Sequence, residues 1–253
     1  MPAAARPRAI ALLILFAWAG AAMAQTASTP DNAAASPSAP GASAPVTPAP
    51  TPGQPEDKRI FGVLPNNRTT DGSIPFAPIT AKQKMTIAFK DSFDWPVYPT
   101  AGAFALLYQL ENQNPSFGQG MKGYAKRWAA AYGDQMIGNM MTEGIVPSLT
   151  HEDPRYFRLG TGSKRTRLRY AVWQIVSTKT DSGHRTFNIA EFGGNAAATA
   201  ISNLYYPDTR TASDNAEKLA IQIATDTFSN VLKEFWPDIK RYLKHKQHPN
   251  SGD

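Results

Sequence analysis

One short polar segment, residues 151–158, carries the densest set of functional groups in the chain. It runs His-Glu-Asp-Pro-Arg-Tyr-Phe-Arg and combines an imidazole, two carboxylates and two guanidinium groups. Such side chains could transfer protons in acid–base catalysis or hold an anion. His151, Asp153 and, from a later turn, His184 are therefore candidate catalytic residues. Ion pairs within the segment are the competing explanation for its composition.

Basic side chains gather in and just after this segment. The candidate ligand-binding residues are Arg155, Arg158, Lys164, Arg165, Arg167 and Arg169. The last four fall in the first turns of a predicted helix, where cations oppose the helix dipole. Nearby acids such as Glu152 and Asp153, or an anionic ligand, should offset this charge. The cluster predicts a basic face over residues 155–169 for an anionic membrane surface or an envelope protein, with a solvated face as the alternative.

Composition argues against several other kinds of site. The chain has no cysteine, which excludes disulfides, thiolate metal sites and cysteine nucleophiles. Its net charge of +6 comes from no single long basic block, so we expect no nucleic-acid partner. His151 and His184 with neighbouring carboxylates make a poor transition-metal set, so we expect no metal and no cofactor. The sequence also lacks a Gly-x-Ser-x-Gly elbow, a phosphate-binding glycine loop and a His-Glu-x-x-His motif.

The beginning of the chain predicts export. Arg6 and Arg8 precede an apolar run, and Ala22-Met-Ala24 matches a signal-peptidase cleavage pattern. This arrangement is typical of a signal peptide over residues 1–24, with an uncleaved membrane anchor as the alternative. We therefore expect a periplasmic or envelope-associated protein.

Composition also predicts the domain organisation. Residues 25–56 consist mostly of Pro, Ala, Ser and Thr and contain no aromatic residue, which predicts a disordered linker. Residues 57–245 are long enough for a single folded domain. Residues 246–253 are predicted to be a flexible tail.

The fold class predicted for this domain is all-α, an irregular bundle of about six helices. Apolar residues recur at helical spacing, and no stretch sustains the alternation of a strand. One helix should begin at Thr80, which forms a capping box with Gln83, and another should begin at Ser163. These helices would carry or flank the polar segment.

The polar segment itself should lie between two helices. The helix before it has an inward apolar stripe that starts at Met121, and this helix is predicted to end near Pro147. Asp153-Pro154 resembles an N-cap followed by proline, which predicts a helical turn over residues 154–159 closed by Gly160.

Two later helices complete the predicted bundle. Gly193 and Gly194 predict a close approach between two helix backbones. In the last helix, Asp214 and Glu217 form the expected cap, and an apolar stripe continues to Trp236.

The turn Ser182-Gly183-His184 resembles the Ser-Gly-His element of the phosphatidic-acid phosphatase superfamily, an all-α family that acts on lipid phosphates. The upstream cations of that family would correspond to Arg155, Arg158 and Lys164. Its nucleophilic histidine has no counterpart here, because no histidine follows His184 before His245. The resemblance implies an alternative function, a hydrolase of phosphoesters or lipid phosphates with His184 and His151 as acid–base groups.

Longer stretches across the domain resemble an uncharacterised family of exported bacterial proteins. They cover residues 59–66, 114–120, 151–158, 201–208 and 230–240. This resemblance implies export and a single domain, and no activity comes with it. Together with the basic face, it makes a binding or structural module of the cell envelope the main functional hypothesis.

Overall fold

The computed structural model describes residues 59–60, 64–65, 68–72 and 74–247. All of them belong to one of the two compact units of the chain, residues Thr51–Asp253. The predicted signal peptide and linker lie outside the described residues, as does most of the predicted tail.

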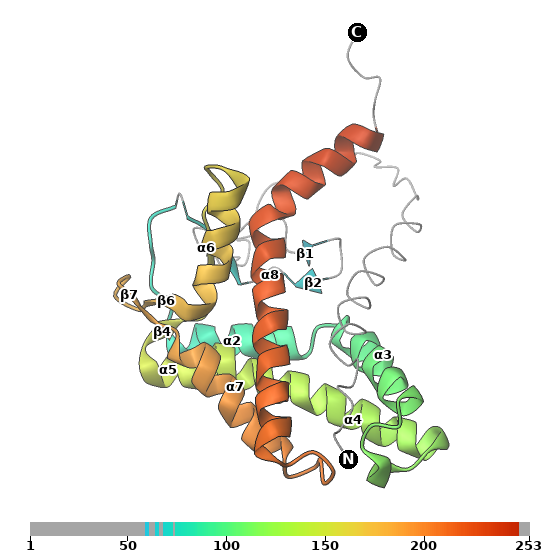
Figure 1. Cartoon of the computed structure of the whole chain (residues 1–253). Helices are drawn as coiled ribbons and strands as arrows, with labels where there is room; N and C mark the ends of the chain where they lie inside the picture. Colours follow the sequence, from blue (N-terminus) through green and yellow to red (C-terminus); the bar gives the residue numbers. More distant parts are fainter. Residues whose placement is uncertain (1–58, 61–63, 66–67, 73, 248–253) are drawn as a thin grey trace, which may run out of the picture. The chain divides into compact units, whose positions relative to one another are not determined.

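The all-α fold class is confirmed, because helices make up 67% of the described residues. The α-helices are α2 (Ala81–Ser92), α3 (Val97–Leu110), α4 (Gly120–Asn139), α5 (Val146–Thr150), α6 (Lys164–Val176), α7 (Ile189–Ser202) and α8 (Ala212–Gln247). A 3-10 turn, η1 (Pro115–Phe117), precedes α4, and a π-helical segment, η2 (Met140–Ile145), joins α4 to α5. The long helix α8 packs against both α6 and α7 (Figure 1).

Two predicted helix starts are confirmed by their capping hydrogen bonds. The backbone N–H of Thr80 donates to Gln83 Oε1 at 2.8 Å, and the N–H of Gln83 donates to Thr80 Oγ1 at 3.3 Å. Ser163 Oγ accepts the N–H of Thr166 at 3.2 Å. Each bond satisfies a backbone donor that the first helical turn leaves free.

The cap of α8 differs from the prediction. The N–H of Thr211 donates to Asp214 Oδ2, and the N–H of Asp214 donates to Thr211 Oγ1, both at 3.1 Å. Thr211 is therefore the capping residue. Asp214 occupies the position three residues after the cap, which the sequence predicted for Glu217. The helix starts three residues earlier because the threonine hydroxyl and the aspartate satisfy each other's backbone donors.

The helix predicted to end near Pro147 continues instead through η2 into α5. Proline is tolerated there because it lies in the first turn of α5, after the wider π-helical turn. Helices α2 and α7 both pack on η2. A Cβ on Gly144 of η2 would lie 2.8 Å from Met85 Sδ of α2, and one on Gly194 of α7 would lie 3.0 Å from the Cα of Thr142. Gly194 thus makes the predicted close approach.

Short strands, which the sequence did not predict, connect the helices. Among the described residues they are β1 (Arg59–Ile60), β2 (Leu64–Pro65), β3 (Thr69–Asp71), β4 (Glu152–Asp153), β5 (Tyr156–Arg158), β6 (Ser177–Thr180) and β7 (Arg185–Phe187). β1 pairs with β2, β3 runs parallel to β5, and β6 lies between β4 and β7 in an antiparallel sheet. The helical turn predicted over residues 154–159 is therefore wrong. The N–H of Tyr156 donates to Arg68 O at 2.7 Å, so pairing with a distant segment replaces the local turn.

Charged side chains occupy much of the interior. The least exposed large side chains include Arg127, Lys84, Glu143, Glu152 and Glu234. On α4, Arg127 is buried, whereas Met121, predicted to face inward, is 83% exposed. The Arg127 guanidinium donates to the carbonyl oxygens of Gln113 and Gly118, each at 2.6 Å, and so fixes the loop before α4. Hydrogen bonds from a buried charged side chain thus hold segments together where the sequence predicted apolar packing.

Candidate functional site

Two acids of the predicted polar segment have structural partners. The buried Glu152 carboxylate accepts the N–H groups of Ile189 at 3.0 Å and Ala190 at 2.7 Å, and so caps the N-terminus of α7. Asp153 is also buried, and its Oδ2 lies 2.6 Å from Arg155 Nη2. These contacts favour the ion-pair explanation for the composition of the segment.

His151 follows the end of α5, and His184 lies in the turn between β6 and β7. The His151 side chain is 81% exposed, and its Nδ1 lies 3.7 Å from Asp181 Oδ2. The N–H of Asp181 donates to the His151 carbonyl, and His184 is exposed on the same turn. Within the described part of the chain, no hydrogen bond or ion pair joins either histidine to Asp153. The three candidate catalytic residues therefore do not form a linked set.

The predicted basic cluster divides into paired and exposed cations. Arg155 pairs with Asp153, and Arg158 Nη2 lies 2.6 Å from Asp71 Oδ2. Arg167 is buried, with its Nε 2.8 Å from Glu234 Oε1. The remaining three cations are exposed and form no ion pair with a described residue: Lys164, Arg165 and Arg169.

Helix α6 turns one side to the interior and the other to solvent. Its buried residues are Arg167, Ala171, Gln174 and Ile175, which fall on one side of a helix with 3.6 residues per turn. Its exposed residues are Lys164, Arg165, Thr166, Leu168, Arg169, Val172, Trp173 and Val176. Cations thus occupy the first turns of the outer side, and apolar side chains occupy the last turns.

The strand β7 extends this exposed surface. The N–H of Asn188 donates to the Val176 carbonyl at 2.9 Å and brings the end of β7 to the end of α6 (Figure 1). Phe187 and Ile189 are exposed on either side of Asn188, and Arg185 is exposed on β7. We call this surface the α6–β7 face; its members are Lys164, Arg165, Leu168, Arg169, Val172, Trp173, Val176, Arg185, Phe187 and Ile189.

At the start of α6, Lys164 and Arg165 form no ion pair with an acid among the described residues. The first turn of the helix contains no acidic residue. Of the two acids expected to serve, Glu152 caps α7 and Asp153 binds Arg155. Lys164 and Arg165 therefore add charge to the positive end of a helix dipole and form no ion pair with a described carboxylate. Glu234 and Asp238 of α8 offset the charge of Arg167, so solvent or an anionic ligand is left to offset Lys164 and Arg165.

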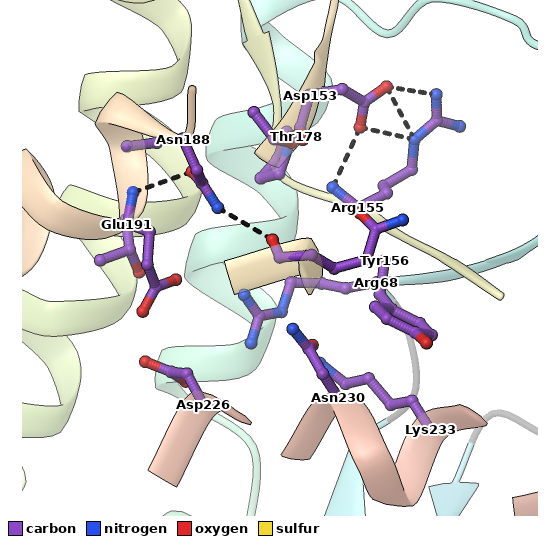
Figure 2. Close-up of a pocket in the computed structure, with 14 residues that line it drawn as sticks. Arg68, Asp153, Arg155, Tyr156, Thr178, Asn188, Glu191, Asp226, Asn230 and Lys233 are labelled. Atoms are coloured by element: carbon purple, nitrogen blue, oxygen red, sulfur yellow. Dashed lines mark hydrogen bonds and ion pairs between the residues drawn. The ribbon is translucent and has the colours of Figure 1, made fainter. Parts of the chain in front are cut away.

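A polar pocket lies on the inner side of α6, between α6, α7 and α8. Its cavity volume is about 50 Å³, and it is partly open to solvent. Its walls include Arg68, Gln174, Glu191, Asp226, Asn230 and Lys233. Figure 2 shows Glu191 and Asp226 on one side of Arg68, and Asn230 and Lys233 on the other.

The pocket belongs to a buried charge network. Arg68 Nη1 lies 3.0 Å from Glu143 Oε1, and Arg68 Nε lies 3.3 Å from Asp91 Oδ2. Burial raises the pKa of Glu143 to about 8, against the attraction of Arg68. Burial, followed by the nearby Asp226 carboxylate, also raises the pKa of Glu191 well above its usual value. At neutral pH the network therefore keeps protons on carboxyl groups.

No pattern in the sequence predicts this pocket as a whole. Arg68 lies in the entry segment, Glu191 on α7 and Lys233 on α8, so no local pattern joins them. One sequence pattern does indicate part of it. Asp226, Asn230 and Lys233 recur at helical spacing within the apolar stripe of the last helix, which places three polar side chains on one side of that helix.

Comparisons with known proteins give no guide to this site. No family model, curated protein or solved structure matches the chain. No group of three or more His, Asp or Glu side chains in the described ranges could hold a metal ion. Of the helices described, none combines the length and apolar character needed to span a membrane.

Proposed function

We propose that this protein is an exported, non-enzymatic module that binds the surface of anionic phospholipid membranes through the α6–β7 face. One observation carries the proposal: unpaired cations and exposed apolar side chains share this surface. Trp173 is 57% exposed on the same outer side of α6 as the cations, and Phe187, beside the end of that helix, is 53% exposed. Export rests on the predicted signal peptide.

The composition of the face suits the boundary between headgroups and acyl chains. Lys164, Arg165 and Arg169 can reach lipid phosphates, while Trp173 and Phe187 can enter the apolar layer below them. Each cation near an anionic leaflet contributes about 1 kcal/mol. Apolar surface that leaves water contributes roughly 25 cal/mol per Å². The two contributions act together because α6 holds both kinds of side chain on its outer side.

The rigid attachment of α6 also supports the proposal. Arg167 Nη2 donates to the Glu234 carbonyl at 2.5 Å, and Arg167 Nε donates to the Glu234 carboxylate at 2.8 Å. These bonds anchor the inner side of α6 to α8. The outer side can therefore contact a membrane without ordering a flexible segment, which would cost conformational entropy.

Vesicle binding tests the proposal. Wild type and the variant Arg165→Gln/Arg169→Gln are mixed with phosphatidylcholine vesicles that contain or lack phosphatidylglycerol, and the bound fraction is measured by sedimentation. We expect binding to the anionic vesicles alone. Loss of two cations should weaken it by about 2 kcal/mol, or roughly thirtyfold.

A matched control separates the face from the overall charge. Lys122 and Lys126 on α4 are exposed and lie outside the face, so Lys122→Gln/Lys126→Gln removes the same charge elsewhere. We expect this control to bind like wild type. Trp173→Ser should weaken binding without changing its dependence on salt. Equal losses in the two double variants, or no binding by wild type, would contradict the proposal.

The alternative function, a phosphoester hydrolase, has less support from the site. It needs His151 and His184 together with free cations, yet Arg155 and Arg158 are held in ion pairs. A phosphatase assay that compares wild type with His184→Ala tests it. Activity in wild type that disappears in the variant would favour the hydrolase over the membrane module.

A further inference from the structure

Most polar side chains around the pocket already have protein partners. Thr178 Oγ1 donates to the Asp153 carbonyl at 2.9 Å, and Asn188 bonds to Glu191 N and the Gln174 carbonyl. Three other side chains carry N–H donors that form no hydrogen bond with a described residue: Gln174, Asn230 and Lys233. Gln174 Nε2 is buried without a hydrogen-bond partner, and the residue is 6% exposed. Lys233 is 5% exposed, and its Nζ forms no hydrogen bond or ion pair with a described residue.

These three donors reach the pocket from two helices that pack together. Asn230 and Lys233 are three residues apart on α8, so their side chains are neighbours on one side of that helix. Gln174 belongs to the buried side of α6, which contacts α8. All three side chains line the same pocket. Their unused donors thus surround one space.

Some acceptors around the pocket are occupied. Glu191 Oε1 accepts a hydrogen bond from Asn195 Nδ2 at 3.0 Å. Asp153 accepts hydrogen bonds from Arg155. The buried donors of Gln174 and Lys233 have no hydrogen-bond partner among the described residues, and a ligand that brings acceptors would supply one. Asp226, Asp91 and Glu143 attract the Lys233 ammonium group from nearby, but none of them forms an ion pair with it, so a bound anion could still add binding energy there.

We infer that the pocket binds a small molecule through a carboxylate group, which pairs with Lys233 Nζ and accepts hydrogen bonds from the amides of Gln174 and Asn230. A carboxylate offers two oxygens, enough for these donors. Its single charge suits the site better than a phosphate dianion because Glu191 and Asp226 lie close by. The Asp226 carboxylate also lines the pocket and can accept a hydrogen bond, so a hydroxyl on the ligand can bond there. This inference does not depend on the membrane proposal.

Isothermal titration calorimetry of the full chain tests the inference. The probes are acetate, glycolate, inorganic phosphate and ethylammonium, each titrated at constant ionic strength. We expect saturable binding of acetate and glycolate, weaker binding of phosphate and none of ethylammonium. Gln174→Leu should weaken binding about tenfold, and Lys233→Met should abolish it.

Lys164→Met serves as the control, since it removes a cation of the α6–β7 face and none of the pocket. It should leave acetate binding unchanged while weakening vesicle binding. If Lys233→Met fails to fold, as judged by circular dichroism, then Gln174→Leu and Asn230→Leu decide the question. The inference is overturned if wild type binds neither carboxylate, if ethylammonium or phosphate binds more tightly, or if these folded variants bind like wild type.

Discussion

The buried carboxylate of Glu234 gives the sharpest stability prediction. Its oxygens accept hydrogen bonds from Tyr156 OH at 2.8 Å, from the N–H groups of Leu159 and Gly160 at 2.9 Å, and from Arg167 Nε at 2.8 Å. One side chain of α8 thus holds β5, the following turn and α6. Glu234→Gln preserves the shape but replaces one acceptor oxygen with an NH₂ group.

The expected loss follows from these contacts. The new NH₂ group would face donors that the carboxylate now satisfies, and each unsatisfied buried donor costs about 1–3 kcal/mol. Arg167 would also lose its fully buried counter-ion, although Asp238 remains 2.5 Å from Arg167 Nη1. Breaking a buried ion pair by removing one partner costs about 3–5 kcal/mol. We therefore expect Glu234→Gln to lower the free energy of unfolding by about 3–5 kcal/mol, a large share of the total stability of a domain.

Urea unfolding followed by circular dichroism measures this loss. Asp238→Asn is the matched control because Asp238 lies on the same helix and contacts the same arginine, but its side chain is 36% exposed. Solvent screening should limit its cost to about 1 kcal/mol or less. Equal losses in the two variants, or a loss below about 1 kcal/mol for Glu234→Gln, would refute the claim that burial makes Glu234 contribute more to the free energy of unfolding than Asp238 does.

Three further predictions follow from the packing and the buried charges. Because burial raises the pKa of Glu143 to about 8, from 4.5 in the unfolded chain, the folded state keeps a proton that the unfolded state releases. The free energy of unfolding should therefore decrease as the pH rises from about 5 to about 8. Glu143→Gln should flatten this pH dependence in urea titrations. Gly194→Ala should destabilise by about 1–3 kcal/mol because its Cβ would meet the backbone of Thr142, whereas Gly193→Ala should be neutral or stabilise by up to about 1 kcal/mol. Arg127→Met removes the donor to the buried Asn114 carbonyl and to the partly buried carbonyls of Gln113 and Gly118, and thermal unfolding should show a loss of about 2–4 kcal/mol; no change in Tm would contradict its assigned role.

Local signals in the sequence predicted the helices well. Thr80 and Ser163 each satisfy a backbone donor within three residues of their own position, so their caps could be identified without knowledge of the rest of the fold. The fold class was equally accessible, because helical periodicity depends on residues only three or four positions apart. The spacing of charges along the predicted helix likewise identified Lys164, Arg165 and Arg169 as candidate ligand-binding residues.

The tertiary structure alone decided which charged residues are buried. Arg167 belonged to the same predicted basic cluster as Arg165, yet it pairs with Glu234, which lies 67 residues away. The pocket joins Arg68, Gln174 and Lys233 from three separate elements. Ion pairs of this kind depend on distances between segments, and a hydrophobic pattern contains no information about those distances. The sequence therefore determined which segments are helical, and the packing of those helices determined which charges face solvent and which line the pocket.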